Sequence, residues 1–465
     1  MTQCYTEPAR ELPVLGDYDV VVCGGGPSGC AAALAAARHG ATTLLLEKDG
    51  YLGGATVSQI VAVILSTNGV DFQGVWHEYI RGLQRRDAVR PFNHTPGHIS
   101  SAVDPEQVKY VWDELLTASG VALLHHVYVA TPIVEDGAAS GLCVETKAGR
   151  QVIRARRMID ATGDGLVAAQ AGVPWAQGDG THPYAMACTK IFRLGGVEDI
   201  PYPLAQETMD RLRAELEAAI ARGEYTTPVV TTINRLLGYI QGGAWQLPGR
   251  RHEILSVISR VLAVNPLDPW DITRAEREGR EQARQAADFY CRYVPGFEQA
   301  YLLDTSNHLG VRSSRRIQGL ATVTSEDAQA FRKYADSIAR ASWELDVWPA
   351  DSYTAPTVPR DSAEWRLRRE RMVAGEYYDI RYGCIVAFGV DNLLLAGRCI
   401  SAEHAAESSL RIQQTCMATG QAAGTAAALS LRAGVTPHEL DPQGVVRQLE
   451  IDRAAVEPAV IFDIS

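Results

Sequence analysis

The feature that most constrains the fold of this chain is a short apolar strand that runs directly into a glycine-rich turn and an alanine-rich helix. The strand covers residues 19–23, the turn holds Gly24, Gly26 and Gly29 in the spacing G-x-G-x-x-G, and the helix covers residues 30–39. Gly24 permits the tight turn, Gly26 lets the backbone approach a pyrophosphate closely, and Gly29 lets the helix pack against the strand. The segment therefore predicts the start of a βαβ nucleotide-binding fold.

The residues around this turn predict a dinucleotide site. Pro27 and Ser28 stand at the start of the helix, where free backbone amides and the helix dipole attract phosphate. A second expected strand, residues 43–46, ends at Glu47, whose carboxylate can accept hydrogen bonds from a ribose diol, and Lys48 follows it. The alternative interpretation is an ordinary glycine-rich β–α turn, which the acidic residue after the second strand disfavours.

Composition and charge argue against several other classes of protein. The chain has 465 residues, of which 46% are hydrophobic and 21% charged, values typical of a globular enzyme long enough for two connected domains. A net charge of -11 argues against a nucleic-acid partner, and the apolar runs are too short to span a membrane. The N-terminus lacks the apolar core of a signal peptide, so a cytoplasmic protein is expected. The nine cysteines contain no C-x-x-C, and we expect no metal site.

The order of expected elements indicates an α/β fold in which one domain is inserted into another. Residues 14–176 should form a three-layer, Rossmann-like domain that has a mostly parallel sheet and a small antiparallel insert. An α+β substrate domain at residues 177–376 interrupts it; the first domain resumes over residues 377–434, before a C-terminal extension at 435–465. Strands are expected at residues 122–125, 130–134, 141–146, 151–154 and 158–161, and long helices at residues 105–116, 204–222, 274–293, 327–343 and 413–433.

Three later segments favour FAD over NAD as the dinucleotide. Each lies at an expected strand end or helix start, where an extended FAD needs close contacts. The residues are Gly53, Gly54, Ala55 and Thr56; Ala161, Thr162, Gly163 and Asp164; and Gly397 and Arg398 together with Gly420, Gln421 and Ala422. No second G-x-G-x-x-G follows a strand, so we expect no separate NAD(P)H domain.

Four sequence blocks carry a family resemblance. They are YLGGAT (51–56), HLGVRSSRRIQG (308–319), YDIRYGCIVAFGVDNLLLAGRCISAEHAA (378–406) and TCMATGQAAGTAAAL (415–429). On these blocks the chain resembles the FAD-dependent oxidoreductase family, which has the glutathione-reductase-type FAD fold and is related to fumarate-reductase-like flavoproteins. The resemblance implies FAD bound non-covalently by default, redox chemistry on a small molecule, and a return of the 308–319 block to the flavin. It is weakest over about residues 180–300, where substrate choice should reside.

Two of these blocks hold the candidate catalytic residues. Arg312 and Arg315 would share a face if they lay on a helix, and could clamp a substrate carboxylate or the FAD phosphates; a solvated basic turn is the alternative. His404 has an ordinary pKa suited to a general base, although a surface histidine is the alternative. Arg411 resembles a family arginine, and Tyr382 precedes the late strand and could line the pocket.

The leading functional hypothesis is the oxidation of a small polar organic molecule by hydride transfer to flavin N5. His404 would accept the proton, an arginine would hold the substrate, and oxygen or another acceptor would reoxidise the flavin. The resemblance implies a further histidine and glycine after His404, which this chain lacks; Glu407 could supply a replacement carboxylate.

The alternative hypothesis is a fumarate-reductase-like ene-reductase in which an arginine acts as acid. A flavin monooxygenase or halogenase ranks third, because Gly397–Arg398 stands where those proteins usually carry Gly-Asp. A flavoprotein partner in RNA modification is disfavoured by the acidic charge. Covalent flavin attachment and a homo-oligomer both stay open.

Overall fold

The computed structural model of the chain describes residues 5–66, 74–95, 98–198, 204–233, 236–237, 244–353 and 362–452. The main sheet consists of β1 (Val14–Cys23), β2 (Thr43–Glu47), β6 (Ala122–His125), β7 (Tyr128–Glu135), β8 (Ala138–Thr146), β9 (Gly149–Asp160) and β18 (Leu393–Leu395). Among the described residues its order is β6-β2-β1-β9-β8-β7, and β18 pairs with β9. Parallel pairing joins β6, β2, β1, β9 and β18, whereas β7 and β8 are antiparallel additions. This confirms the predicted α/β fold with a mostly parallel sheet.

The glycine-rich segment forms the predicted strand, turn and helix. β1 runs parallel to β2, with Val20 opposite Thr43 and Cys23 opposite Leu46, and α1 (Pro27–Arg38) follows the turn. The apolar end of β1 is fully buried because the strand lies between β2 and β9 and beneath helices. A central parallel strand buried on both faces reads as a continuous apolar run, which is the pattern of Val20–Cys23.

The antiparallel insert continues the main sheet through one long strand. The sequence predicted two strands, at 151–154 and 158–161, whereas β9 runs without a break from Gly149 to Asp160. Its first half pairs with β8 and its second half with β18. Arg157, which lies between the two predicted strands, is 9% exposed, and its guanidinium donates to Ser430 Oγ at 2.8 Å and to the Val435 carbonyl at 2.6 Å.

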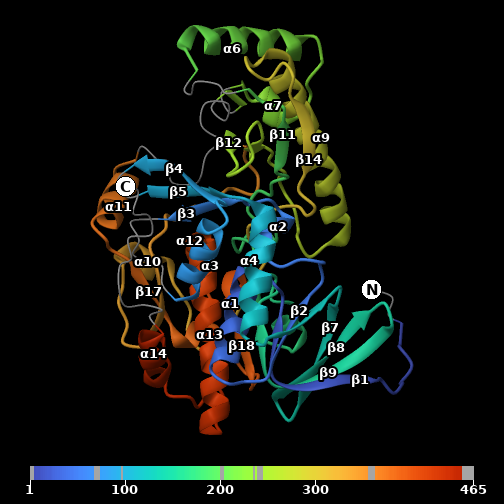
Figure 1. The fold of residues 1–465 in the computed structure, drawn as a ribbon, viewed down its shortest axis with the longest axis vertical. Helices are drawn as coiled ribbons and strands as arrows, with labels where there is room; N and C mark the ends of the chain where they lie inside the picture. Colours follow the sequence, from blue (N-terminus) through green and yellow to red (C-terminus); the bar gives the residue numbers. More distant parts are fainter. Residues whose placement is uncertain are drawn as a thin grey trace.

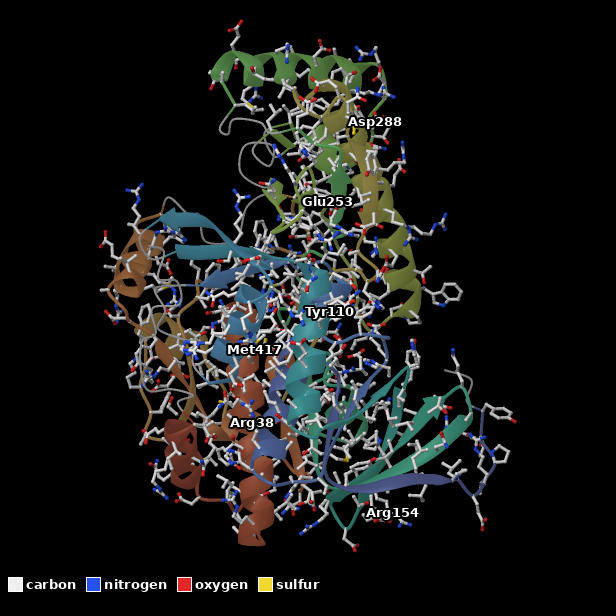
Figure 2. The ribbon with its side chains drawn as sticks, viewed as in Figure 1. Arg38, Tyr110, Arg154, Glu253, Asp288 and Met417 are labelled. Carbon is white, nitrogen blue, oxygen red and sulfur yellow. The ribbon has the colours of Figure 1, made fainter. Side chains whose placement is uncertain are left out.

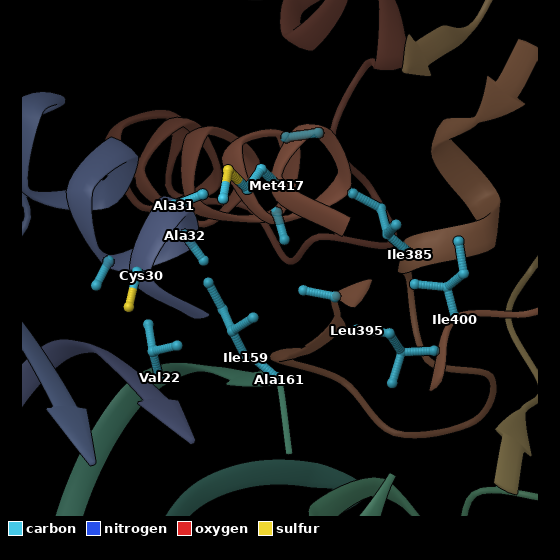
Figure 3. Packing of buried hydrophobic residues seen from close by; sticks show 14 of the residues in the cluster. Val22, Cys30, Ala31, Ala32, Ile159, Ala161, Ile385, Leu395, Ile400 and Met417 are labelled. Carbon is cyan, nitrogen blue, oxygen red and sulfur yellow. The ribbon is translucent and has the colours of Figure 1, made fainter. Parts of the chain in front are cut away.

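Helix α13 (Gln413–Ala433) occupies the predicted range and packs directly on α1. Gly420 and Gly424 make this close approach possible, since a Cβ at either position would lie less than 3.0 Å from a backbone oxygen of α1, that of Ser28 or Ala32. Figure 3 shows Ala31 and Ala32 of α1 near Met417 of α13 and Ile159 of β9, all within one hydrophobic cluster. The two helices therefore cover the parallel strands as a unit.

A second unit carries its own hydrophobic core. It consists of β11 (Phe192–Gly195), β12 (Ala244–Gln246), β13 (Ile254–Ser256), β14 (Tyr301–Thr305), α6 (Gln206–Ala221), α7 (Pro228–Thr231) and α9 (Pro269–Tyr293). The strands form an antiparallel sheet in the order β12-β13-β11-β14. Figure 1 shows α6 at the end of the molecule farthest from the main sheet, and Figure 2 shows Glu253 and Asp288 in this unit and Arg38 and Met417 in the other. Its core residues, Phe192 to Phe297, fall inside the predicted substrate domain.

The helix predicted over residues 327–343 is wrong. The structure has α10 (Ser325–Ala330) followed by β16 (Ser337–Ala341), which pairs with β17 (Tyr378–Arg381). Phe331 ends the helix in a left-handed conformation, with φ of 54°. Helical spacing of apolar residues over this segment thus came from a short helix and a half-buried strand joined end to end.

The other elements complete the described part of the chain. They are α2 (Ala55–Ser58), β3 (Val63–Ser66), α3 (Val75–Gln84), β4 (Val89–Thr95), β5 (His98–Val103), α4 (Pro105–Ala118), α5 (Leu166–Gln170), β10 (Trp175–Gln177), β15 (Arg315–Ile317), α11 (Ala363–Val373), η1 (Tyr382–Ile385), η2 (Gly397–Cys399), α12 (His404–Leu410) and α14 (Pro442–Ile451). In the predicted C-terminal extension, residues 453–465 lie outside the described residues. No helix in the described part of the chain combines the length and apolar character needed to cross a bilayer.

Candidate functional site

The glycine-rich turn forms an open cradle at the carboxyl edge of the parallel sheet. Gly24 has φ of 104°, and a Cβ there would lie 2.5 Å from the Ala161 carbonyl oxygen, so only glycine fits. Gly26 is the N-cap of α1 and no side chain caps the helix, while a Cβ on Gly26 would meet nothing nearer than Gly54 Cα at 3.9 Å. An uncapped helix N-terminus that faces open space suits the close approach of a pyrophosphate.

Glu47 is fixed at the end of β2 by two backbone donors. Its Oε2 accepts from the Gly25 amide at 2.7 Å and its Oε1 from the Asp49 amide at 2.8 Å. Burial outweighs these hydrogen bonds and raises the pKa of Glu47 above its ordinary value. Each carboxylate oxygen keeps a second lone pair, which a ribose hydroxyl can use. Lys48 Nζ lies 3.8 Å from the Asp49 carboxylate, and the predicted contact of Lys48 with the cofactor stays a prediction.

The second glycine turn is tied to the N-terminus of α13. Gly53 and Gly54 have φ of 105° and 48°, and α2 begins immediately after them at Ala55. Thr56 Oγ1 donates to Gln413 Oε1 at 2.9 Å, and Gln413 Nε2 donates to the Val61 carbonyl at 3.0 Å. The sequence predicted a cofactor role for residues 53–56 but did not identify Gln413, the first residue of α13.

The carboxyl ends of β9 and β18 bring the predicted residues 161–164 next to Arg398. After Ala161, Thr162 donates through its amide and its hydroxyl to the buried Asp160. Asp164 Oδ1 accepts from Arg398 at 2.6 Å and from Ser314 Oγ at 2.7 Å. Burial disfavours ionised Asp164, but Arg398 and these hydrogen bonds outweigh it and hold the pKa below its ordinary value. A Cβ on Gly163 would lie 3.2 Å from Arg398 Nη2, so glycine leaves room for this pair.

The late glycine segments hold the two helices in place around this edge. A Cβ on Gly397 would lie 2.5 Å from Ser28 Oγ, and Gly420 contacts the Ser28 backbone. Gln421 Oε1 accepts from the Val75 amide at 3.1 Å, and Ala422 is fully buried in the core. These contacts position the start of α1; a direct contact of Gly420, Gln421 or Ala422 with the cofactor stays a prediction.

Arg312, Arg398 and Arg411 form one electrostatically linked set, termed here the arginine group. Arg398 pairs with Asp164, and Arg411 pairs with Asp346 at 3.0 Å. Arg312 donates to the Ala187 carbonyl and lies 5.9 Å from the ring centre of Trp348. Burial lowers the pKa of Arg411 to about 10, and the charges of Arg312 and Arg398 also oppose its protonation.

Residues 311–314 have no regular secondary structure and β15 begins at Arg315, so Arg312 and Arg315 do not lie on a helix, the one case in which they would share a face. Arg315 starts β15, where its Nη1 donates to the Asp164 carbonyl oxygen at 3.1 Å and its guanidinium lies 5.2 Å from the ring centre of Trp175. The two arginines therefore reach the site from different directions.

His404 and Glu407 lie three residues apart on α12. Burial, together with Arg316, lowers the pKa of His404, and its buried Nδ1 has no hydrogen-bond partner among the described residues. Glu407 is 1% exposed and its Oε2 lies 3.3 Å from Arg316 Nη1. Residues three apart share one side of a helix, so the structure brings both candidate proton acceptors together.

Tyr382 does not join this group, so the structure does not support its predicted place in the pocket. Its hydroxyl donates to the Pro437 carbonyl at 2.7 Å, beyond the C-terminal end of α13, whereas Arg411 precedes the N-terminal end of that helix. A helix of 21 residues is about 30 Å long. The position of Tyr382 inside the family block 378–406 gave no indication of this separation.

The uncapped start of α1, the carboxylate at the end of β2 and the strand ends of β9 and β18 define an FAD-binding enzyme of the Rossmann-like class. The family model "FAD dependent oxidoreductase" matches residues 19–449, and the chain belongs to this family. It is therefore an FAD-dependent oxidoreductase, and the open cradle at Gly26 and the free lone pairs of Glu47 fit the cofactor.

Individual relatives match only parts of the chain. The tRNA uridine 5-carboxymethylaminomethyl modification enzyme MnmG of Geotalea uraniireducens is 33% identical over 147 residues, 28% of this chain and 22% of that protein. A 3-oxosteroid 1-dehydrogenase of Mycobacterium tuberculosis is 32% identical over 123 residues, 25% of this chain and 18% of that protein. The match thus spans less than a quarter of the length of either relative.

One solved structure illustrates how far the similarity extends. A geranylgeranyl bacteriochlorophyll reductase-like protein from Thermoplasma acidophilum is 12% identical, with a TM-score of 0.44, over 94% of this chain and 84% of that chain.

Proposed function

We propose that this enzyme oxidises a small polar organic molecule that carries a carboxylate or a similar anionic group. Bound FAD supplies the hydride acceptor, N5 of its ring system, and oxygen or another acceptor takes the electrons onward. The observation that carries the proposal is the arginine group at the edge of the sheet where the cradle for FAD lies.

Electrostatics favours an anion at this position. Arg411 is paired with Asp346, yet burial and the charges of Arg312 and Arg398 lower its pKa to about 10. Mutual repulsion among these partly buried guanidiniums is relieved when a ligand adds negative charge. A substrate carboxylate would accept charge-assisted hydrogen bonds there and would be held in a fixed orientation.

His404 supports the oxidative direction because burial and Arg316 favour its neutral form. A neutral imidazole can accept the proton that an O–H or N–H group releases when the neighbouring carbon loses a hydride. The unpartnered Nδ1 of His404 is the atom we assign to this step.

The proposal is tested with the FAD-loaded enzyme under anaerobic conditions. Small alcohols and amines are offered in matched pairs, each a carboxylate and its uncharged amide, and the loss of flavin absorbance is followed. We expect the carboxylate member of a pair to reduce the flavin. In Arg312→Met, the carboxylate concentration that gives half-maximal flavin reduction should rise by about tenfold or more. Arg284→Met on the exposed side of α9, where Arg284 pairs with Glu281, is the matched control. Equal reaction of the uncharged partner, or an unchanged requirement in Arg312→Met, would refute the proposal.

A second candidate function rests on Arg411. An ene-reductase of the fumarate-reductase type needs an arginine that can release a proton, and the pKa of about 10 makes Arg411 a better acid than Arg398, whose pKa is raised. Chemically reduced enzyme that is reoxidised by unsaturated carboxylates, but is not reduced by any alcohol or amine, would favour this function.

A further inference from the structure

Glu407 is a buried carboxyl group with one unused oxygen. It lies in the middle of α12, directly after the β18–η2 segment that carries Arg398, and its side chain is 1% exposed. Oε2 lies 3.3 Å from Arg316 Nη1, whereas Oε1 is buried and has no hydrogen-bond partner in the described part of the chain. A buried, ionised carboxylate with an empty acceptor position is costly, so this oxygen is available for a proton.

The groups around Glu407 make its charge sensitive to the occupant of the site. Arg316 on β15, Arg398 on η2 and Arg411 after α12 all favour its ionised form. On its own helix, His404 lies one turn before it. The acidic residues of the neighbouring α10, Glu326 and Asp327, are engaged by Arg332.

Burial nevertheless outweighs the three arginines and raises the pKa of Glu407 to about 7. The carboxyl group is therefore poised between its two forms near neutral pH. Negative charge that enters near Arg398 and Arg411 weakens the attraction of these two guanidiniums for the ionised carboxylate of Glu407. It therefore shifts Glu407 toward its protonated form.

We infer that Glu407 is a further proton-exchanging residue of the site, which takes up the proton that the substrate releases as its hydride leaves. The inference rests on the proposed oxidation. In that step the C–H electron pair leaves with the hydride to FAD, the O–H or N–H bond breaks, and a C=O or C=N bond forms. The released proton ends on Glu407 Oε1, directly or after acceptance by His404 on the same side of α12. The carboxylate thus becomes a neutral acid when the hydride adds negative charge to the site.

The test measures protons rather than turnover. The reduction potential of bound FAD is determined against a reference dye from about pH 5.5 to about pH 8.5 in the wild type, Glu407→Gln and Glu403→Gln. Glu403 is the matched control because it is an exposed carboxylate at the N-cap of the same helix, where it accepts from the Ser325 amide at 2.8 Å. We expect the wild type and Glu403→Gln to take up one more proton per two electrons than Glu407→Gln in the region around pH 7.

Infrared difference spectra of the reduced minus oxidised wild-type enzyme give a second readout. A carbonyl band of a protonated carboxyl group should appear on reduction and should be missing in Glu407→Gln. The same pH dependence in all three proteins, or a wild-type difference spectrum without such a band, would overturn the inference, the latter even if Glu407→Gln fails to fold. Neither measurement uses the proposed substrate. A failure of the proposed oxidation can therefore be told apart from a failure of this inference.

Discussion

Replacement of Gly424 by alanine should separate the two helices that hold the FAD cradle. A Cβ at Gly424 would lie less than 3.0 Å from the Ala32 carbonyl oxygen, a distance that real Cβ atoms essentially never show. The obstacle is backbone inside a helix, so no side-chain rotation can relieve the clash, and α13 must move away from α1. Overpacking of this kind costs about 1–3 kcal/mol.

Helix propensity acts in the opposite direction and must be controlled. Alanine is favoured over glycine in a helix by about 1 kcal/mol. Gly444→Ala in α14 supplies the control, because the nearest atom to its added Cβ is Arg447 Nη2 at 4.0 Å. Gly424→Ala should therefore be less stable than Gly444→Ala by about 1–3 kcal/mol.

The assay combines urea unfolding of the apoprotein, followed by circular dichroism, with FAD titration followed by flavin fluorescence. Gly424→Ala should unfold at lower urea than the wild type or Gly444→Ala. It should also bind FAD about tenfold more weakly or worse, because the moved α1 no longer presents its first amides at the required position. If Gly424→Ala equals Gly444→Ala in both stability and FAD affinity, the close contact of α1 and α13 does not position the cradle.

Four further predictions follow from the site. Glu47→Gln should weaken FAD binding by about tenfold to a hundredfold in the fluorescence titration, because a charged acceptor for a ribose hydroxyl is lost. Asp346→Ala should destabilise the enzyme by about 3 kcal/mol in urea unfolding, since Arg411, which is only 16% exposed, loses its carboxylate partner, and a second change of Arg411→Met should recover most of that loss. Tyr382→Phe should lower stability by about 1 kcal/mol and leave the rate of flavin reduction unchanged, so a large loss of rate would return this residue to the site. The pKa of Glu407 is raised in the folded state, to about 7, so its contribution to stability should be lost as pH rises; relative to Glu407→Gln, the wild type should lose up to about 3 kcal/mol between pH 5 and pH 8, and parallel curves would contradict this.

Local signals in the sequence predicted the FAD-binding half of the molecule well. The apolar run before Gly24, the proline at the first position of α1 and the acidic residue at the end of β2 each act over a few neighbouring residues, and the structure contains all three elements. The same holds for α4, whose N-cap Asp104 accepts from the Glu106 amide at 2.9 Å.

The partners of the charged residues could not be predicted, because they come from distant parts of the chain. Asp346, which pairs with Arg411, stands in a segment with no motif, and Arg316 looked no different from its neighbour Arg315 until β15 set their opposite directions. Oε1 of Glu407 is buried without a hydrogen-bond partner from the described residues because several elements pack around it at once, and no single stretch of sequence encodes that packing.

The visible absorption spectrum of the purified protein, before and after acid precipitation, tests the central claim most directly. We predict flavin absorbance that is released into the supernatant as FAD, since the open cradle at Gly26 and the carboxylate of Glu47 would hold the cofactor through non-covalent contacts. A colourless protein that also fails to bind added FAD would contradict it.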